Sequence, residues 1–419
     1  MLINIQISAR PSTDPRSLSS MLGVAIRIAQ RMGLHDESVT GRCGVLEAEM
    51  RRRLWWSLVH FDHRISSLAE HPTTVLSPTW DCRVPLNIND SDLRSDMADE
   101  PPKTQRGATE AIFAVVRAEL GDFVRHSPSH LDFTNPALKP IARPLPGGDD
   151  PGAALSRTME DEYLRFCDPG IPLHFLTIWT ARSHVSRSRL IDYYARHPRR
   201  FEHPHAGRGA AEGDAAERDA VLLDVFRILE YDTKMCASPL TAGFQWLLQL
   251  HFPFPAYIHI VTELRRRPLG PHAQRGWEVM AGNFEARFRH LESSSMPSFV
   301  MFANVVLQAW DVLEEALGAT GEPVTPPRIV EMIQDALAVA AQRDNKMDEV
   351  EQPSSSGGMM MPMPMPMGFG PVSYTGADPG VFPGVFSGMA DMYTQAPWGI
   401  VNPLSLASMA SMCWGPGQG

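Results

Sequence analysis

The chain has 419 residues, of which 43% are hydrophobic and 21% are charged, a balance typical of a soluble protein with a sizeable core. Lys and Arg number 38 against 48 Asp and Glu, and the net charge of −10 argues against phosphate binding over the whole surface. The five cysteines lie far apart, which excludes zinc-finger and CxxC redox spacing. No run of about 18 apolar residues occurs, and Arg10 follows the first apolar stretch, so we expect neither a membrane span nor a secretory signal.

Apolar residues recur at steps of three and four along most of the first 350 residues, which is the period of amphipathic α-helices. The stripes include Ile28 and Met32 in the first helix and Leu54 in the second, and we expect them to face a core. Helices are expected at residues 18–32, 46–68, 110–125, 156–166, 173–196, 217–235, 241–250, 256–267, 274–289, 298–317 and 327–342. Alternation of β-branched residues is nearly absent, so the predicted fold class is all-α.

Composition divides the chain into two parts. Connections rich in Pro, Gly and His are expected at residues 127–152 and 197–213 within the helical part. Residues 353–419 hold ten Met, ten Pro and twelve Gly with only two charges, and such a sequence cannot maintain helix or sheet hydrogen bonds. We therefore predict a multi-helix body at 1–350 and a disordered, low-complexity tail at 351–419.

The sequence contains no catalytic motif, since GxxxxGK[ST], HExxH, GxSxG and a GxGxxG after a strand are all absent. The polar segment 80–93 is predicted to be a loop. Its run from Asn87 resembles a calcium loop, but the sixth position is Asp92 instead of Gly and the twelfth is Ala98 instead of Glu. We expect these side chains to cap backbone groups.

Pairs of possible metal ligands lack a third partner: His60 and His63, His126 and His130, His203 and His205, Asp149 and Asp150. The chain is therefore predicted not to be an enzyme and to hold no catalytic, cofactor or metal site.

Two arginine triplets, Arg51–Arg53 and Arg265–Arg267, could serve nuclear import or phosphate binding. The sequence favours a structural role for both. Arg51–Arg53 follow Glu47 and Glu49 at the spacing of intrahelical ion pairs. Arg265–Arg267 close a helix just before Pro268, where cations complement the helix dipole.

One face of the second predicted helix mixes apolar and charged residues. Arg51, Trp55, Asp62 and Ile65 share this face. An acid and a base are tolerated on such a face only when each is paired on burial. We predict that Asp62, together with Trp55 or Trp56, is buried in a polar network that serves the fold.

Four segments resemble, in chain order, the middle homology region of fungal zinc-cluster transcription factors. They are GVAIRIAQRMGLHDES, LEAEMRRRLWWSLVHFDHRIS, EHPTTV and VPLNINDSDL. PAYIHIVTELRRRPLGPHAQRGWEVM is similar to a later helical stretch of the same family, so the resemblance extends over residues 1–345. The chain departs from the family pattern at His63, where the family has Arg, and at Glu70-His71-Pro72, where it has GRP. The family-signature residues, expected to be structural, are Gly33, Leu34, His35, Glu49, Arg51, Arg52, Arg53, Trp55, Trp56, Asp62, Pro72, Asp90 and Asp92, with further matches at Arg27, Ala29, Ser66, Pro85, Asn87 and Asn89.

The resemblance implies a nuclear regulator of RNA polymerase II transcription, of which this chain is the regulatory or effector-sensing body. Family members contact promoter DNA through an N-terminal module in which six cysteines hold two zinc ions. This chain shows no such cluster, so zinc and promoter DNA are expected only through a module outside it. Either the sequence is a truncated gene product or the protein has no DNA reader of its own. Expected partners are other regulators or coactivators, and a small-molecule effector and a homodimer remain open. The alternative is a DNA-independent helical module that sequesters a partner regulator.

Overall fold

The computed structural model describes residues 15–66, 76, 79–94, 102–128, 131, 140–142, 151–197, 212–288, 297–320 and 325–350. Within these ranges every regular element is a helix and no strand occurs, which confirms the all-α prediction. The expected tail, residues 353–419, lies outside the described residues. None of the described helices combines the length and the apolar composition needed to cross a bilayer.

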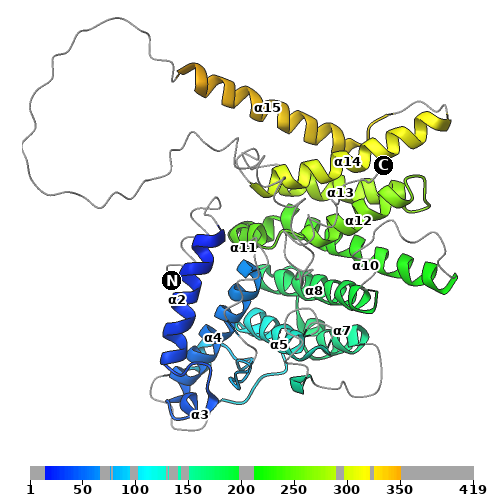
Figure 1. The fold of residues 1–419 in the computed structure, drawn as a ribbon. Coiled ribbons are helices and arrows are strands. Elements are labelled where there is room, and N and C mark those ends of the chain that lie inside the picture. The colour runs from blue at the N-terminus through cyan, green and yellow to red at the C-terminus, as the bar shows by residue number, and fades with distance from the viewer. Residues whose placement is uncertain are drawn as a thin grey trace, which may run out of the picture.

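The helices follow one another in layers (Figure 1). The N-terminal elements are α2 (Pro15–Arg31), α3 (Glu37–Thr40), α4 (Val45–Ser66), the 3₁₀ turn η1 (Asp90–Asp92) and α5 (Ile112–His126). The middle elements are α7 (Pro151–Glu162), η3 (Leu164–Phe166), α8 (Pro172–Arg196) and α10 (Glu212–Ala237). The C-terminal elements are η4 (Pro239–Phe244), α11 (Gln245–Leu250), α12 (Phe254–Arg266), α13 (Ala273–Phe288), α14 (Pro297–Thr320) and α15 (Arg328–Val350).

Three large groups of buried apolar side chains hold these layers together. The N-terminal core joins α2 and α4 to the loop before η1, and Ala118 of α5 and Leu250 of α11 reach into it. A second core lies between α5, α7 and α8. The third joins the C-terminal part of α8 to α10, α12, α13, α14 and α15. The α5 helix therefore contributes to two cores and connects the N-terminal helices to the rest of the body.

The helices lie close to the positions predicted from the sequence, but the burial of several single side chains differs from the prediction. Ile28, Met32 and Leu54 were expected in the core, and this is wrong, because they are 54%, 53% and 50% exposed. Leu22 and Ile26 lie on the buried face of α2 instead. The apolar face of α2 is wider than the part of the helix surface that is buried against the core. Periodicity alone therefore does not identify which residues of that face pack against α4.

Two local elements also differ from the prediction. The short helix α3 (Glu37–Thr40) was not expected, because four residues are too few to show a period. Residues 241–250 were expected to form one helix, but they divide into the 3₁₀ segment η4 and the α-helix α11. Pro239 at the first position of η4 and Gly243 within it favour this tighter, shorter start.

Candidate functional site: the polar network around α4

The turn after α2 requires a glycine. Gly33 has a φ of +71°, in the left-handed region, and a Cβ atom there would lie 2.7 Å from Cγ1 of Val39. The N–H of Leu34 donates to the carbonyl of Ala29 at 3.0 Å, as in a Schellman helix end. Leu34 is consequently turned into the N-terminal core, where it is 1% exposed.

The triplet Arg51–Arg53 connects α4 to three different segments. The first arginine donates through Nη1 to the carbonyl of Met32, 2.9 Å away in the turn after α2. The second hydrogen-bonds the carboxylate of Glu37 in α3. The third donates through Nη1 to Oδ1 of Asp90, 2.8 Å away in η1. Consecutive residues of a helix point in directions about 100° apart, so one turn of α4 can hold all three segments.

The same arginines form the intrahelical pairs that the sequence predicted. Nε of Arg51 lies 2.9 Å from Oε1 of Glu47, and Nε of Arg53 lies 3.1 Å from Oε1 of Glu49. Glu49 is completely buried, and its two oxygens accept the backbone N–H of Leu86 at 3.1 and 3.2 Å. Burial raises the pKa of the Glu49 carboxyl, against the opposing effect of these hydrogen bonds.

Glu37 joins α3 to α4 and to the loop before η1. Its carboxylate accepts hydrogen bonds from Arg52 and from the backbone N–H of Arg83, the latter at 3.0 Å. The N–H of Glu37 itself donates to Oδ1 of Asp81 at 2.8 Å. Burial alone would raise the pKa of Glu37, but the hydrogen bonds from Arg52 and Arg83 hold it below its ordinary value.

The two tryptophans of α4 are buried as predicted, with Trp55 1% and Trp56 2% exposed. Trp80 from the loop meets both edge-on, with ring centroids 5.7 and 6.1 Å away. The guanidinium of Arg125 lies 4.8 Å from the ring of Trp80 and donates to its carbonyl at 2.7 Å. The ring centroid of His35 lies 5.7 Å from that of Trp55.

The loop from Asn87 caps backbone groups, as the sequence predicted. The side chain of Asn87 donates to the carbonyl of Gln105 at 2.8 Å and accepts from Oγ1 of Thr109 at 2.6 Å. Oδ2 of Asp92 accepts the N–H of Asn89 at 3.0 Å and Nε2 of Gln105 at 2.8 Å. These carboxylate and amide groups are occupied by contacts within the chain, which agrees with the capping role.

Asp62 is buried as predicted, with 3% exposure, and its Oδ2 accepts the N–H of Leu76 at 3.1 Å. It does not pair with Arg51, because the two positions are about 16 Å apart along the helix. Pro72 lies outside the described residues.

The sequence did not identify three contributors to this network: Glu37, Asp81 and Arg125. Asp36 accepts the N–H of Ser38 at 2.8 Å as the N-cap of α3, so the sequence Asp-Glu-Ser was the local signal for Glu37. The contacts of Asp81 and Arg125 join segments that are distant in the sequence, so no local sequence pattern predicts these contacts.

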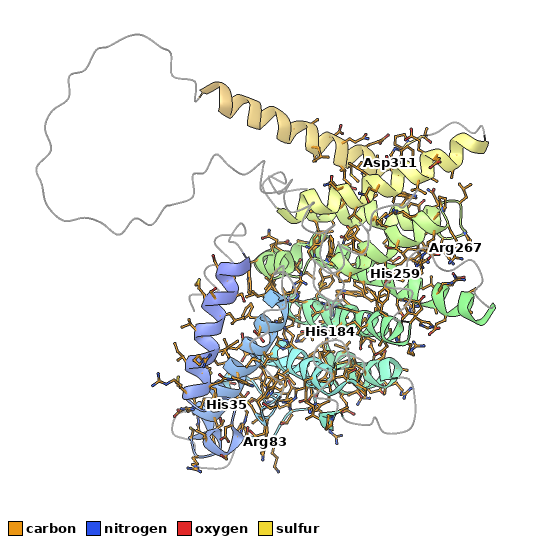
Figure 2. All side chains as sticks on the ribbon, in the orientation of Figure 1. His35, Arg83, His184, His259, Arg267 and Asp311 are labelled. Atoms are coloured by element: carbon orange, nitrogen blue, oxygen red, sulfur yellow. The ribbon has the colours of Figure 1, made fainter. Side chains whose placement is uncertain are left out.

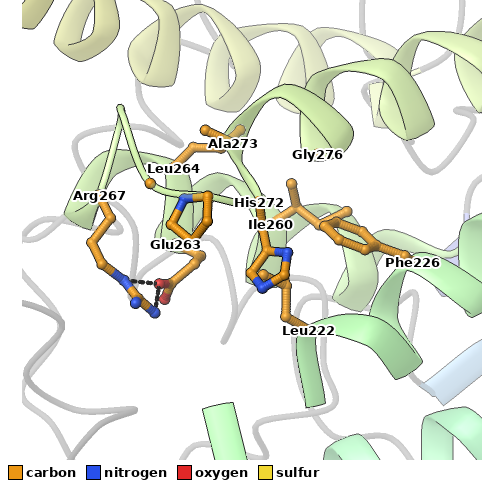
Figure 3. A pocket seen from close by; sticks show the side chains of 11 residues that line it. Leu222, Phe226, Ile260, Glu263, Leu264, Arg267, His272, Ala273 and Gly276 are labelled. Atoms are coloured by element: carbon orange, nitrogen blue, oxygen red, sulfur yellow. Dashed lines mark hydrogen bonds and ion pairs between the residues drawn. The ribbon is translucent and has the colours of Figure 1, made fainter. Parts of the chain in front are cut away.

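The second triplet ends α12 as expected, with Arg265 and Arg266 in its last turn. Arg267 donates through Nε to Oε1 of Glu263, 2.5 Å away and one turn earlier. This pair borders a small pocket between α10, α12 and α13 (Figure 3). Most of the other side chains around the pocket are apolar. The guanidinium of Arg267 is paired with Glu263 and lies 3.9 Å from Oδ1 of Asp219 in α10.

The described residues do not fit a zinc cluster. They contain no group of three or more His, Cys, Asp or Glu that could hold a metal ion. Burial raises the pKa of the thiols of Cys82 and Cys236 to about 12 and that of Cys167 to about 11, so these thiols stay protonated near neutral pH. Zinc binds cysteine as the thiolate.

With this geometry established, comparison with known proteins identifies the region. Residues 2–117 match the family described as "Fungal specific transcription factor domain". Residues 2–117 are thus similar to a fungal specific transcription factor domain. The part of the network from Gly33 to Thr109 lies within the matched residues, and Arg125 lies beyond them. The sequence resemblance to the middle homology region of zinc-cluster regulators is confirmed.

Proteins that resemble this chain are regulators by name. It is 46% identical over 334 residues to "Transcriptional regulator AacuB" of Aspergillus aculeatus, a match that covers 79% of this chain and 44% of the relative. It is 46% identical over 330 residues to "Transcriptional regulator nsrM" of Aspergillus novofumigatus, covering 77% and 43%. "C6 finger domain transcription factor hasF" of Aspergillus fumigatus is 26% identical over 264 residues, covering 58% and 33%.

The chain thus spans less than half the length of the curated relatives it matches here. Their names describe transcription factors and not enzymes, in agreement with the expectation from the missing catalytic motifs. No solved structure gives a significant match to the chain.

Proposed function

We propose that this chain is the regulatory body of a fungal zinc-cluster transcription regulator that acts in the nucleus on RNA polymerase II transcription. The observation that carries the proposal is the 46% identity to two named transcriptional regulators over most of the helical body. Promoter DNA would be contacted through a six-cysteine zinc module, because the described residues of this chain do not fit such a cluster.

The contacts around α4 support a regulatory rather than a DNA-reading body. The guanidinium group of each arginine in Arg51–Arg53 donates a hydrogen bond to a carboxylate or a backbone carbonyl of the chain. These contacts within the fold compete with any contact to a DNA phosphate. The net charge of −10 also opposes association with DNA. We infer that the body acts on other regulators or coactivators through its folded surface.

A tethering experiment tests this proposal. The chain is fused to a heterologous DNA-binding domain, and reporter transcription in a fungal host is compared with that of the DNA-binding domain alone. We expect the fusion to change reporter output in either direction. Glu49→Ala, which breaks the buried network, should remove the change, whereas Glu47→Ala at an exposed pair should keep it.

The same assay distinguishes the alternative function. A sequestering module would leave the tethered reporter unchanged and would instead alter the output of a second regulator when expressed without a DNA-binding domain. An unchanged tethered reporter would therefore contradict the proposed regulatory body. A fluorescently tagged chain that remains outside the nucleus would contradict the proposed location.

A further inference from the structure

Three arginine side chains line one cavity between α7, α8 and α10. Helix α8 runs through the middle of the body, where Figure 2 labels His184 on it, and it packs against both α7 and α10 (Figure 1). The cavity has a volume of about 190 Å³, and its arginines are Arg182 and Arg189 of α8 and Arg227 of α10. One water molecule needs only about 10–15 Å³ of such space, so the cavity has room for several waters or one small ligand.

Helical spacing explains why these side chains meet at the cavity. Arg182 and Arg189 are seven residues apart, which is close to two full turns, so they lie on one face of α8. Arg227 lies one turn before Tyr231 on α10, and both residues line the cavity. The stem of Arg189 crosses the first turn of α7, where a Cβ atom on Gly152 would lie 2.6 Å from its Cγ atom. The arginines therefore reach the cavity from two helices and along the start of a third.

The carboxylates beside the cavity do not occupy all the hydrogen-bond donors of these arginines. Arg182 donates through Nε and Nη2 to the two oxygens of Glu160, at 2.7 and 3.0 Å. Arg189 and Arg227 share one oxygen, Oδ1 of Asp224, to which each donates through Nη1, at 3.3 and 2.9 Å. Their Nε and Nη2 atoms form no hydrogen bond with the described residues. Three guanidinium cations beside two carboxylates therefore leave one positive charge unbalanced and several N–H donors open.

A tetrahedral anion fits these donors better than a planar one does. A carboxylate has two oxygens in one plane and is satisfied by a single planar fork, as Glu160 is by Arg182. A phosphate group has oxygens on several sides, so it can accept hydrogen bonds from two guanidinium groups at once. We propose that the cavity binds a phosphate group, with Arg189 and Arg227 as its main ligands and Arg182 as a third source of positive charge. This binding activity does not rest on the proposed regulatory function.

Calorimetric titration of the full chain near pH 7 tests the site. The probes are inorganic phosphate, glycerol phosphate and acetate as sodium salts, with sodium chloride at matched ionic strength as the reference. We expect phosphate or glycerol phosphate to bind at one site per chain, and acetate to bind at least about tenfold more weakly. Tighter binding of glycerol phosphate than of phosphate assigns a phosphate ester as the ligand, and equal or weaker binding assigns the free ion. The proposal is overturned if neither phosphate probe binds above chloride, or if acetate binds as tightly as they do.

A pair of arginine variants locates the binding. Arg227→Met should weaken phosphate binding about tenfold or more, which is the effect of losing one charge-assisted hydrogen bond. Arg275→Met is the matched control and should bind phosphate as the wild type does. The Arg275 side chain is 47% exposed and pairs with Glu230 at 3.0 Å, much as Arg227 is 48% exposed and pairs with Asp224 at 2.9 Å, but Arg275 does not line the cavity. Equal affinities of the two variants would overturn the proposal.

Glu160→Gln should change the affinity in the opposite direction. This variant removes the carboxylate charge that competes for Arg182, so phosphate should bind more tightly than in the wild type. The Glu160 side chain is 41% exposed, so the exchange leaves the core intact. A purely structural role of the arginines predicts no gain in affinity, and weaker binding by Glu160→Gln would contradict the site. Where Arg227→Met does not fold, Arg227→Lys keeps the charge without the planar fork and should also weaken binding.

Discussion

Glu49 and Glu47 lie two residues apart on the same helix, but one side chain is buried and the other is exposed. Burial decides how much a paired carboxylate contributes to the free energy of unfolding. The Glu49 side chain has no exposed surface and is bonded to Leu86 and Arg53. The Glu47 side chain is 59% exposed, and among the described residues its ion-pair partner is Arg51, one turn along the helix. Exposed pairs contribute little to stability, whereas the loss of one partner of a buried pair leaves the other uncompensated.

We therefore predict that Glu49→Ala lowers the free energy of unfolding by about 3–5 kcal/mol. Glu47→Ala should lower it by less than about 1 kcal/mol. Urea unfolding of the two variants beside the wild type measures both values. Equal, small losses would show that Glu49 does not hold the loop before η1 onto α4.

Glu37 gives a pH dependence of known sign. Its pKa is lower in the folded chain than the ordinary value of 4.5, so around and below that pH the unfolded chain binds more protons. Stability from this group is present above pH 4.5 and is lost as the pH falls through the folded-state pKa. Glu37→Gln should flatten the fall of the unfolding free energy below about pH 4.5, and a slope as steep as in the wild type would contradict this origin.

At the scale of elements, the three- and four-residue period predicted nearly every described helix, because each buries one apolar face. Spacing along α4 also predicted the pairs Glu47 with Arg51 and Glu49 with Arg53. It could not predict that Arg52 bonds Glu37 in α3, since that contact depends on the turn at Gly33. Long-range contacts such as Arg64 with Leu250 depend on how whole helices pack, and no local pattern encodes them.

The turn between α2 and α3 allows a test with a matched control. Gly33→Ala places a Cβ at positive φ against Val39 and should lower the free energy of unfolding by at least about 1–2 kcal/mol. Gly282 lies inside α13, where an added Cβ meets nothing within 4 Å, so Gly282→Ala should raise it by about 0.5–1 kcal/mol. Thermal or urea unfolding checks the opposite signs. Two changes of the same sign would contradict the role assigned to Gly33.

At the scale of the whole molecule, the fold class and the family region could be predicted from the sequence, while the sharing of α5 between two cores could not. Ala118 of α5 packs in the N-terminal core, whereas Val116 and Leu120 pack in the core with α7 and α8. Spacing along α5 predicts a helix but does not show that two of its faces are buried against different helices. The body that results is acidic overall and uses its signature arginines for internal bonds.

We propose that the signature residues build a regulatory body and do not read DNA. Titrating a fluorescent library of duplex DNA with the 419-residue chain at about 150 mM salt tests this role most directly. We predict no sequence-dependent binding in the nanomolar range, because Arg51–Arg53 are engaged within the fold and the net charge is −10. Salt-resistant, sequence-dependent binding that is lost on Arg52→Gln or Arg53→Gln, in variants that remain folded, would contradict the claim.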